Sequence, residues 1–434
     1  MYSLCMFGYR YLYLHIYLYL YLCMQLEREY VWILECHRRI QEPEELRNRV
    51  AMLSTHRRKP EAIHEEDMVN ESYEGDFTIV AQLKTCAKKK DLGNGTKIHS
   101  EIVKRGLIEK NPYLASSVIN MYVKCGMLEK AHEVHEELHV RNIVSWNTLI
   151  SGYARQGQGH EALNCYEQME GEGLPPDAVT FIFILKACGI VGDIEKGKQI
   201  HENVLRKGLL GKNIALGTAL VDMYAKCGAL KKAQEVFDQL SVRSIVSWTS
   251  LIAGYTQRGC SDEALKCFKK MKDDGISPDA ITYVCILKAC CSLGFLEVVE
   301  AIDNEVRSQG LLQREIVLGT ALVDTYSKCG AMGKAREIFE HLPVQNAATW
   351  NALIAGYGQL GQINVVLDLY SRMNVEGVPD AVTLLVLLNA CSHAGLVKEG
   401  EALVDEMRIV YCLTPTLEHY TCMIDLFGRA GHFD

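Results

Sequence analysis

The sequence has no surplus of basic residues, and this limits how the protein could hold a polyanion. It carries 46 Lys and Arg against 54 Asp and Glu, a formal net charge of −8 over 434 residues. A basic footprint over the whole molecule, which is the usual electrostatic mark of a nucleic-acid-binding domain, is therefore excluded. Any polyanionic partner has to be held by local groups.

Paired metal ligands are also missing from the chain. None of its 17 cysteines stands in a C-x-x-C arrangement, and structural zinc sites need ligands at such short spacing. Most of the cysteines recur instead at equivalent points of a repeat. We interpret them as small buried hydrophobic residues in a reducing compartment, and we expect neither a metal nor another cofactor.

Long hydrophobic runs are absent as well. The longest one follows Arg10 in a Tyr- and Leu-rich start, and its length of about 14 residues is below the ~20 that a membrane-spanning helix needs. That start lacks the small-residue cleavage site of a secretory signal, and residues 26–75 carry too many Glu for an organellar transit peptide. We expect no membrane contact and treat residues 1–75 as a non-repeat segment outside the fold.

What the sequence does contain is a block of 102 residues that recurs almost without slippage. Lys-Cys-Gly begins at Lys124, Lys226 and Lys328. Self-similarity at a fixed spacing is typical of stacked-repeat proteins, in which each repeat contacts its neighbours. Tryptophan follows the same spacing, and we favour a core position for it over a platform on which bases stack. The three residues are Trp146, Trp248 and Trp350.

Each block divides into three repeat units, and each unit has the pattern of two helices. In residues 143–177, Ser145 is a candidate N-cap, an apolar stripe that includes Val144 follows, and Gly157 ends the first helix. Pro175 and Pro176 stop the second helix. One such pair cannot bury its own stripe, but stacked pairs can. We therefore predict an all-α fold, a right-handed superhelical solenoid of stacked helix-turn-helix repeats whose concave face is lined by first helices.

The repeat array is predicted over residues 76–434, and its complete units are of three kinds. The 35-residue units, the last of which is one residue short, begin near a Trp and end at Pro-Asp. Long units carry Lys-Ala-Cys or Asn-Ala-Cys, and short units carry Lys-Cys-Gly. The units are 76–111, 112–142, 143–177, 178–213, 214–244, 245–279, 280–315, 316–346, 347–380, 381–416 and the truncated 417–434.

Several of these segments match one known family. IVSWNTLISGYARQGQGHEALNCYEQMEGEGLPPD resembles the standard motif of the pentatricopeptide repeat family, and VDMYAKCGALKKAQEVFDQL resembles its short motif. LLNACSHAGLVKEGEALVDEM followed by LEHYTCMIDLFGRAGHFD is similar to a last long motif and the start of a last short one. The alternation of motifs resembles the plant-type subgroup. The resemblance implies sequence-specific binding of single-stranded RNA in mitochondria or plastids, and a role as a specificity factor for cytidine-to-uridine editing.

The resemblance also implies which residues contact bases, because in the family the fifth and last residues of a unit contact one base together. Long units carry Ile182 or Val284 at the fifth position and should read weakly. The implied pairs are Asn147 with Asp177, Thr249 with Asp279 and Asn351 with Asp380 in the 35-residue units, and Ser116 with Asn142, Thr218 with Ser244 and Thr320 with Asn346 in the short units.

The chemistry of these pairs predicts a target. A carboxylate only accepts hydrogen bonds and suits uracil or guanine, whereas an amide can donate to the bare ring nitrogen of adenine or cytosine. At the fifth position, Asn reaches a small pyrimidine, and Ser or Thr leaves room for a purine. With the RNA parallel to the chain, the predicted target is 5′-A-U-n-R-G-n-A-U-n-3′, where n faces a long unit and R is either purine.

The same residues also permit a structural interpretation. Asp after Pro near a helix start is an ordinary cap residue, and Asn, Ser and Thr are ordinary in a first turn. A protein-binding helical scaffold is the alternative class of function, since tetratricopeptide solenoids are built from similar helix pairs. RNA binding could also serve stabilisation, splicing or translation instead of editing. Polar pairs that match base edges favour RNA over a peptide.

Catalytic motifs are incomplete. A zinc deaminase shows H-x-E followed by P-C-x-x-C, and His64-Glu65-Glu66 and His135-Glu136-Glu137 match only the first half. Phe237 and Phe339 stand at the positions equivalent to His135, so we interpret His135 as a packing residue. We expect no enzymatic activity in this chain, so that an editing deaminase would be a partner in trans.

Overall fold

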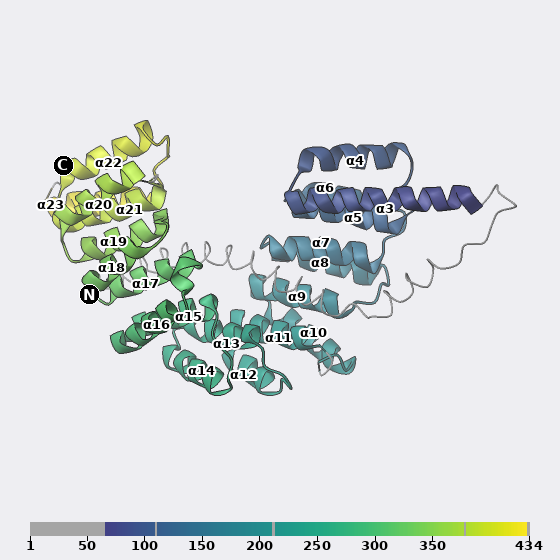
Figure 1. Cartoon of the computed structure of the whole chain (residues 1–434), viewed down its shortest axis with the longest axis horizontal. Helices are drawn as coiled ribbons and strands as arrows, with labels where there is room; N and C mark the ends of the chain where they lie inside the picture. Colours follow the sequence, from purple (N-terminus) through teal and green to yellow (C-terminus); the bar gives the residue numbers. More distant parts are fainter. Residues whose placement is uncertain (1–65, 109–110, 211–212, 377–378, 432–434) are drawn as a thin grey trace. The chain divides into compact units, whose positions relative to one another are not determined.

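The structure is a computed structural model that describes residues 66–108, 111–210, 213–376 and 379–431. The predicted non-repeat segment lies outside the described residues up to residue 65. Every regular element in the described ranges is a helix, which confirms the all-α class (Figure 1). None of these helices combines the length and the hydrophobicity needed to cross a membrane.

First and second helices alternate along the chain and pack in pairs (Figure 1). A short 3-10 turn, η1 (Leu311–Gln313), interrupts the alternation once in the described ranges. The first helices are α3 (Glu66–Lys89), α5 (Pro112–Lys124), α7 (Ile143–Arg155), α9 (Ala178–Val191), α11 (Ile214–Lys226), α13 (Ile245–Gln257), α15 (Ala280–Leu293), α17 (Ile316–Lys328), α19 (Ala347–Gln359), α21 (Ala381–Ala394) and α23 (Leu417–Ala430). The second helices are α4 (Leu92–Lys104), α6 (Leu128–Glu136), α8 (Gly159–Gly171), α10 (Ile194–Arg206), α12 (Leu230–Asp238), α14 (Ser261–Asp273), α16 (Leu296–Ser308), α18 (Met332–His341), α20 (Ile363–Glu376) and α22 (Val397–Ile409).

The described residues form two compact parts, an N-terminal part that ends at Val242 and a C-terminal part that begins at Arg243. In the N-terminal part, α5 packs between α3 and α7, and α9 packs between α7 and α11. In the C-terminal part, the first helices from α13 to α23 form the same kind of row. Second helices such as α8 pack on their own first helix and on the next one. Each part is therefore a stack of helix pairs, which is the architecture of a solenoid.

The last residue of a repeat unit often begins the first helix of the next unit. Asn142 is the N-cap of α7, and its Oδ1 accepts hydrogen bonds from the backbone N–H groups of Val144 and Ser145, both at 2.9 Å. The prediction that Ser145 caps this helix is wrong, because Ser145 is the third helical residue and closes a capping box with Asn142. A capping box has polar residues at both ends, and the sequence pattern does not say which of them comes first.

The three tryptophans lie in the core. Trp146, Trp248 and Trp350 are 1–2% exposed. Trp350 meets Phe339 edge to face with ring centroids 4.6 Å apart, and the indole N–H of Trp146 donates to Glu172 at 2.9 Å. The Trp350–Phe339 contact fills the space between the second helix α18 and the next first helix α19. The core interpretation is confirmed, because side chains this deeply buried leave no ring face for a base.

The prediction of small buried cysteines holds for half of those in the described part of the chain, since seven are buried, six are partly exposed and Cys412 is exposed. All of those described are free thiols, and Cys188 and Cys290 are fully buried. Burial raises the pKa of each of these two thiols to about 12. A thiol with so high a pKa is a poor nucleophile and a poor metal ligand at neutral pH.

His135 should make the fold sensitive to acid. It is 1% exposed, and burial, followed by the nearby Arg141 guanidinium, lowers its pKa from 6.5 to about 4. Between these two pH values His135 is protonated in the unfolded chain but neutral in the folded chain. The free energy of unfolding therefore decreases as the pH falls from 6.5 towards 4. Between pH 7.5 and pH 5 we expect a loss on the order of 2 kcal/mol from this group.

The variant His135→Phe tests this expectation, because phenylalanine occupies the equivalent positions 237 and 339. Urea unfolding at pH 7.5 and pH 5 should show a smaller acid-induced loss for the variant than for the parent chain. His99 and His201, whose pKa values are also lowered by burial, are present in both proteins and cancel in this comparison. Equal losses in the two proteins would contradict the assignment.

Candidate nucleic-acid interface

Unit 143–177 brings its two predicted residues together. Asn147 lies on α7 and Asp177 is the N-cap of α9. Asn147 Nδ2 donates to Asp177 Oδ1 at 3.1 Å. The same oxygen accepts the backbone N–H of Thr180 at 2.8 Å, which is the capping bond. Both predicted residues are half-buried, so part of each side chain stays accessible.

Unit 245–279 joins its pair through a third residue. Thr249 Oγ1 lies 2.7 Å from Thr282 Oγ1, which in turn lies 2.7 Å from Asp279 Oδ1. Asp279 caps α15 by accepting the backbone N–H of Thr282 at 2.8 Å. Thr249 is 8% exposed whereas Asp279 is half-buried. The carboxylate is therefore the more accessible member of this pair.

Unit 347–380 repeats the first arrangement with a longer contact. Asn351 Nδ2 donates to Asp380 Oδ1 at 3.3 Å, and Asp380 caps α21 through the backbone N–H of Thr383 at 2.8 Å. Asp380 is exposed, while Asn351 is 8% exposed. Asn351 Oδ1 is buried without a hydrogen-bond partner among the described residues.

The short units place their predicted residues differently. Ser116 and Thr320 donate to the carbonyl oxygens one turn earlier in their own helices, at 2.9 and 3.1 Å. Asn142 and Asn346 cap α7 and α19. In the described ranges no hydrogen bond joins Ser116 to Asn142 or Thr320 to Asn346.

The remaining predicted pair is divided between the two parts of the molecule, so its members are described separately. Thr218 lies on α11 in the N-terminal part and donates to the Ile214 carbonyl at 3.0 Å. Ser244 caps α13 in the C-terminal part through the backbone N–H of Ser247 at 3.2 Å.

Each capping Asp or Asn of the predicted pairs keeps one polar atom unused. Asp177, Asp279 and Asp380 cap through Oδ1, and their Oδ2 atoms make no hydrogen bond among the described residues. Asn142 and Asn346 also cap through Oδ1, which leaves Nδ2. A carboxylate oxygen only accepts, and an amide nitrogen only donates. The cap and the contact with a ligand, which the sequence presented as alternatives, can therefore use different atoms of one side chain.

The second residue of several repeat units is apolar but exposed, and the sequence pattern did not predict this exposure. Val144 is 53% exposed and Val179 is 46% exposed, so Val144 does not belong to the buried stripe that the pattern predicted. The equivalent Tyr113 is 79% exposed. The signal was available in the sequence: these residues follow the cap by two positions, out of step with the buried stripe of the helix.

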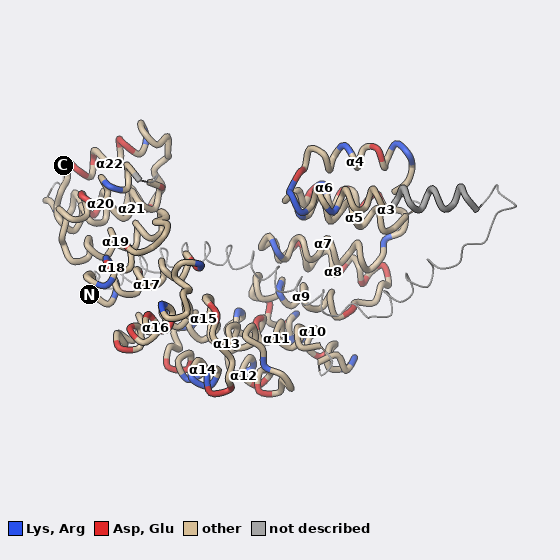
Figure 2. Tube along the Cα trace, in the orientation of Figure 1, with Lys and Arg blue, Asp and Glu red and all other residues tan. Residues whose placement is uncertain are grey.

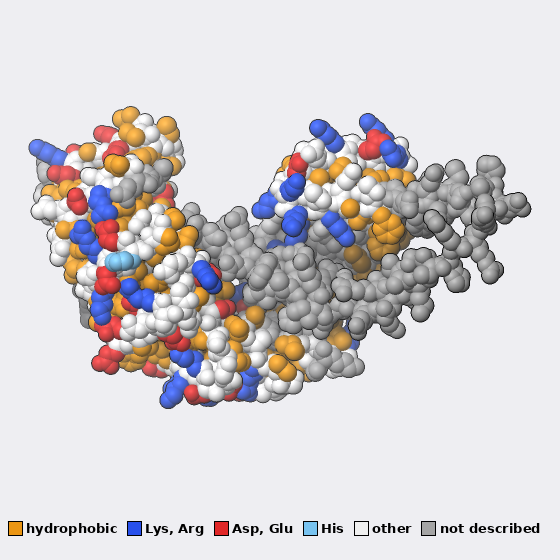
Figure 3. All heavy atoms as spheres, in the orientation of Figure 1, with side chains coloured by type: hydrophobic (Ala, Val, Ile, Leu, Met, Phe, Trp, Pro, Cys, Tyr) orange, Lys and Arg blue, Asp and Glu red, His pale blue; other side chains and the backbone are white. Residues whose placement is uncertain are grey.

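Basic side chains near the ends of first helices pair with acidic neighbours. Lys226 and Lys328 each end a first helix and pair with Asp222 and Asp324 one turn earlier, at 2.8 and 2.6 Å. In Figure 2 residues of both signs are interspersed along second helices such as α14. The face of the C-terminal part drawn in Figure 3 likewise shows basic and acidic side chains next to one another.

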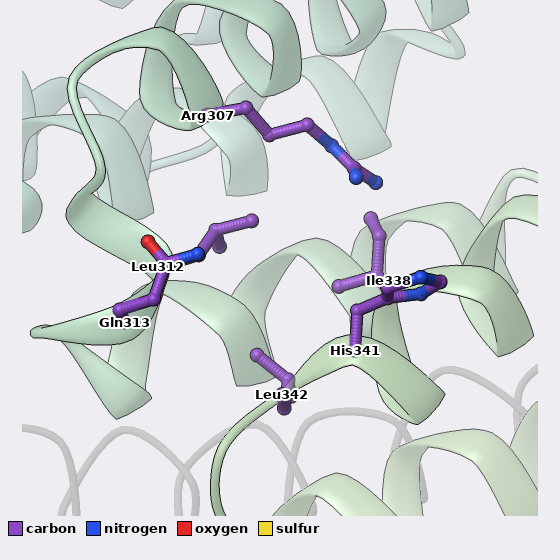
Figure 4. Close-up of a pocket in the computed structure, with 6 residues that line it drawn as sticks. All are labelled: Arg307, Leu312, Gln313, Ile338, His341 and Leu342. Carbon is purple, nitrogen blue, oxygen red and sulfur yellow. The ribbon is translucent and has the colours of Figure 1, made fainter.

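A cleft of about 230 Å³ lies among α16, η1 and α18 (Figure 4). Its basic group is already neutralised, because Arg307 donates to Asp303 at 2.8 Å and pairs with Glu337 at 3.3 Å. We therefore do not take it as the functional site. Its lining residues are Arg307, Leu312, Gln313, Ile338, His341 and Leu342.

The partial deaminase motif at His135 is not assembled into a site. His135 packs against Trp146 with ring centroids 4.2 Å apart, which confirms its packing role. His64 lies outside the described residues. Within the described ranges, no group of three or more His, Cys, Asp or Glu side chains could hold a metal ion.

Comparison with known proteins finds the same repeats in one family. A model described as PPR repeat family matches residues 141–189, 243–292 and 345–393, and a second, described as PPR repeat, matches 114–143, 218–245 and 382–409. A pentatricopeptide repeat-containing protein of Arabidopsis thaliana is 35% identical over 379 residues, which cover 85% of this chain and 67% of that protein. The chain belongs to the pentatricopeptide repeat family.

Other pentatricopeptide repeat proteins extend the comparison. A relative from Arabidopsis thaliana whose name calls it mitochondrial is 36% identical over 361 residues, 83% of this chain and 52% of its own length. The chain thus spans about half to two thirds of these curated relatives. The crystal structure of the pentatricopeptide repeat protein PPR10 in complex with an 18-nt psaJ RNA element matches with a TM-score of 0.59 and 18% identity, over 73% of this chain and 47% of that one. That likeness supports the solenoid fold.

Proposed function

We propose that this chain binds single-stranded RNA and reads its sequence with the polar pairs of its repeat units, one base per unit. The observation that carries the proposal is the contact of Asn147 with Asp177, whose Oδ2 stays unused. The similarity to PPR10, whose structure holds an RNA element, supports the class of ligand. A peptide-binding scaffold would have no need for such atoms at a fixed spacing.

The unused atoms account for the proposed choice of base. In unit 143–177, Asp177 Oδ2 accepts the imino N–H of uracil, and Asn147 Nδ2 keeps one N–H for a carbonyl oxygen of the same base. In unit 245–279, the shorter Thr249 leaves room for a purine, and Asp279 selects guanine. Asn346 instead offers Nδ2 to a bare ring nitrogen and selects adenine. The proposed target is 5′-A-U-n-R-G-n-A-U-n-3′.

Apolar contacts complement the polar ones. The exposed Val144 and Val179 stand at the first turns of the adjacent helices α7 and α9. Asn147 and Asp177 lie at the same ends of these helices, so a base that meets the polar pair also meets aliphatic side chains. Contact with its faces adds affinity without selecting a sequence, whereas the edge contacts provide the selection.

The biological role that fits this binding is that of an organellar specificity factor for cytidine-to-uridine editing, which recruits a deaminase in trans. The alternation of long and short motifs supports membership of the plant-type subgroup, and the mitochondrial names of relatives support a mitochondrial or plastid location. Stabilisation or splicing of the same RNA would use the same binding surface.

A base substitution tests the proposal. The target RNA should bind ~5- to 150-fold more tightly than an RNA in which the guanine opposite Thr249 and Asp279 is replaced by uracil, since a lost base contact costs ~1–3 kcal/mol. Both affinities should fall with added salt because phosphates are contacted as well. Titrations by fluorescence anisotropy measure this. Equal affinities would reject the base assignment, and indifference to RNA together with capture of a peptide would favour a scaffold.

A further inference from the structure

A buried hydroxyl group follows every predicted reading pair. The third residue of the next unit is Thr after the 35-residue units and Ser or Thr after the short units, and each of these residues is 0% exposed. After the long units, whose fifth residue is apolar, the same position is leucine in three of four cases and histidine in the fourth. The hydroxyl residues are Ser145, Thr180, Ser247, Thr282, Thr349 and Thr383, and the others are Leu114, Leu216, Leu318 and His419.

At Thr180 this hydroxyl contacts both members of the pair. Thr180 Oγ1 lies 2.7 Å from Asn147 Oδ1 and 2.9 Å from Asp177 Oδ1. Thr282 Oγ1 lies 2.7 Å from both Thr249 Oγ1 and Asp279 Oδ1. A fully buried hydroxyl needs hydrogen-bond partners, and here the polar atoms around it belong to the reading pair and its cap.

We propose that Thr180 and Thr282 are positioning residues that set base specificity through the pairs they hold; this rests on the proposed RNA binding. When the Thr180 hydroxyl donates to Asn147 Oδ1, the amide cannot turn over, so Nδ2 stays on Asp177. Asp177 Oδ1 is occupied by the backbone N–H of Thr180 and by Asn147, so only Oδ2 is available to the base. Without the Thr180 hydroxyl, the Asn147 amide could turn over and present either its oxygen or its nitrogen to the base.

The chain contains its own comparison. In unit 347–380, Thr383 Oγ1 lies 2.9 Å from Asp380 Oδ1, but Asn351 Oδ1 has no partner among the described residues. Asn351 is thus held only through its Nδ2 atom, whereas Asn147 is held through both Nδ2 and Oδ1. The wild-type chain should therefore distinguish uracil from cytosine more strongly at unit 143–177 than at unit 347–380.

Thr180→Val is the informative variant, with Thr180→Ser as its matched control. Valine removes the hydroxyl but keeps the backbone N–H that Asp177 caps, and serine keeps both. The measurement is the ratio of affinities for RNAs with uracil or cytosine opposite unit 143–177, compared with the guanine-to-uracil ratio opposite unit 245–279. We expect the first ratio to drop from ~10-fold to ~2-fold in Thr180→Val, to survive in Thr180→Ser, and the second ratio to stay constant.

The outcomes separate this inference from the proposed function. If the wild-type chain shows no base preference at all, RNA reading itself fails. If the wild-type chain does show a base preference, a second outcome matters. A Thr180→Val variant that binds both RNAs equally more weakly, or that keeps the wild-type ratio of uracil to cytosine affinity, would mean that Thr180 has only a structural role, and the inference would be overturned. Should Thr180→Val not fold, the wild-type comparison of units 143–177 and 347–380 decides, and equal discrimination at the two units overturns the inference.

Discussion

Replacing Trp350 by alanine is expected to lower the free energy of unfolding by about 3–5 kcal/mol, the range for truncating a large aromatic residue in a core. The indole is 1% exposed, meets Phe339 edge to face, and lies under the guanidinium of Arg372 at 5.4 Å from the ring centroid. Alanine leaves a cavity between α18 and α19. Urea unfolding followed by circular dichroism measures the loss.

The control for this variant is Val344→Ala in the loop that precedes α19, because Val344 is 51% exposed. Its change should stay within about 0.5 kcal/mol. A stable Trp350→Ala protein that no longer bound RNA would mean instead that the ring is a stacking platform.

A reciprocal exchange of capping residues should exchange the bases that two units select. Asp279→Asn is expected to turn the preference of unit 245–279 from guanine to adenine, and Asn346→Asp is expected to turn that of unit 316–346 from adenine to guanine. Both units pair the cap with a threonine at the fifth position, and each variant changes only the cap of its own unit. Each change should alter the ratio of the two affinities by ~30-fold or more, since ~1–3 kcal/mol is gained with one base and ~1–3 kcal/mol is lost with the other.

Stability serves as the control for the exchange. Asp and Asn are equivalent as N-caps, and both residues cap through Oδ1 in this structure. The melting temperature should therefore change little while the base preference reverses. A variant that bound the guanine RNA and the adenine RNA equally weakly would contradict reading by the cap, and would leave Asp279 and Asn346 as structural residues only.

Sequence reasoning was reliable where one helical turn carries the information. The period of apolar residues and the glycines after helix ends indicated helix pairs, and the tryptophans were expected in the core and lie there. Two predictions for the first turn of α7 were wrong, namely Ser145 as the N-cap and Val144 as a buried residue. Ser145 belongs to a two-ended motif whose direction the sequence does not show, and Val144 is an apolar residue that the packing of α7 leaves outside the core.

The sequence by itself determined the repeat period and the helical class, because these depend on neighbours along the chain, and the fifth and last residues of each unit were singled out by the family resemblance. Tertiary structure alone decided that Asp177 turns Oδ1 to its cap and to Asn147 while Oδ2 stays unused, and that Thr180 lies against both. Asn147 and Asp177 are 30 residues apart. Their contact exists only because α9 stacks beside α7, and the distances set by that stacking choose which atom of each side chain remains available to a partner.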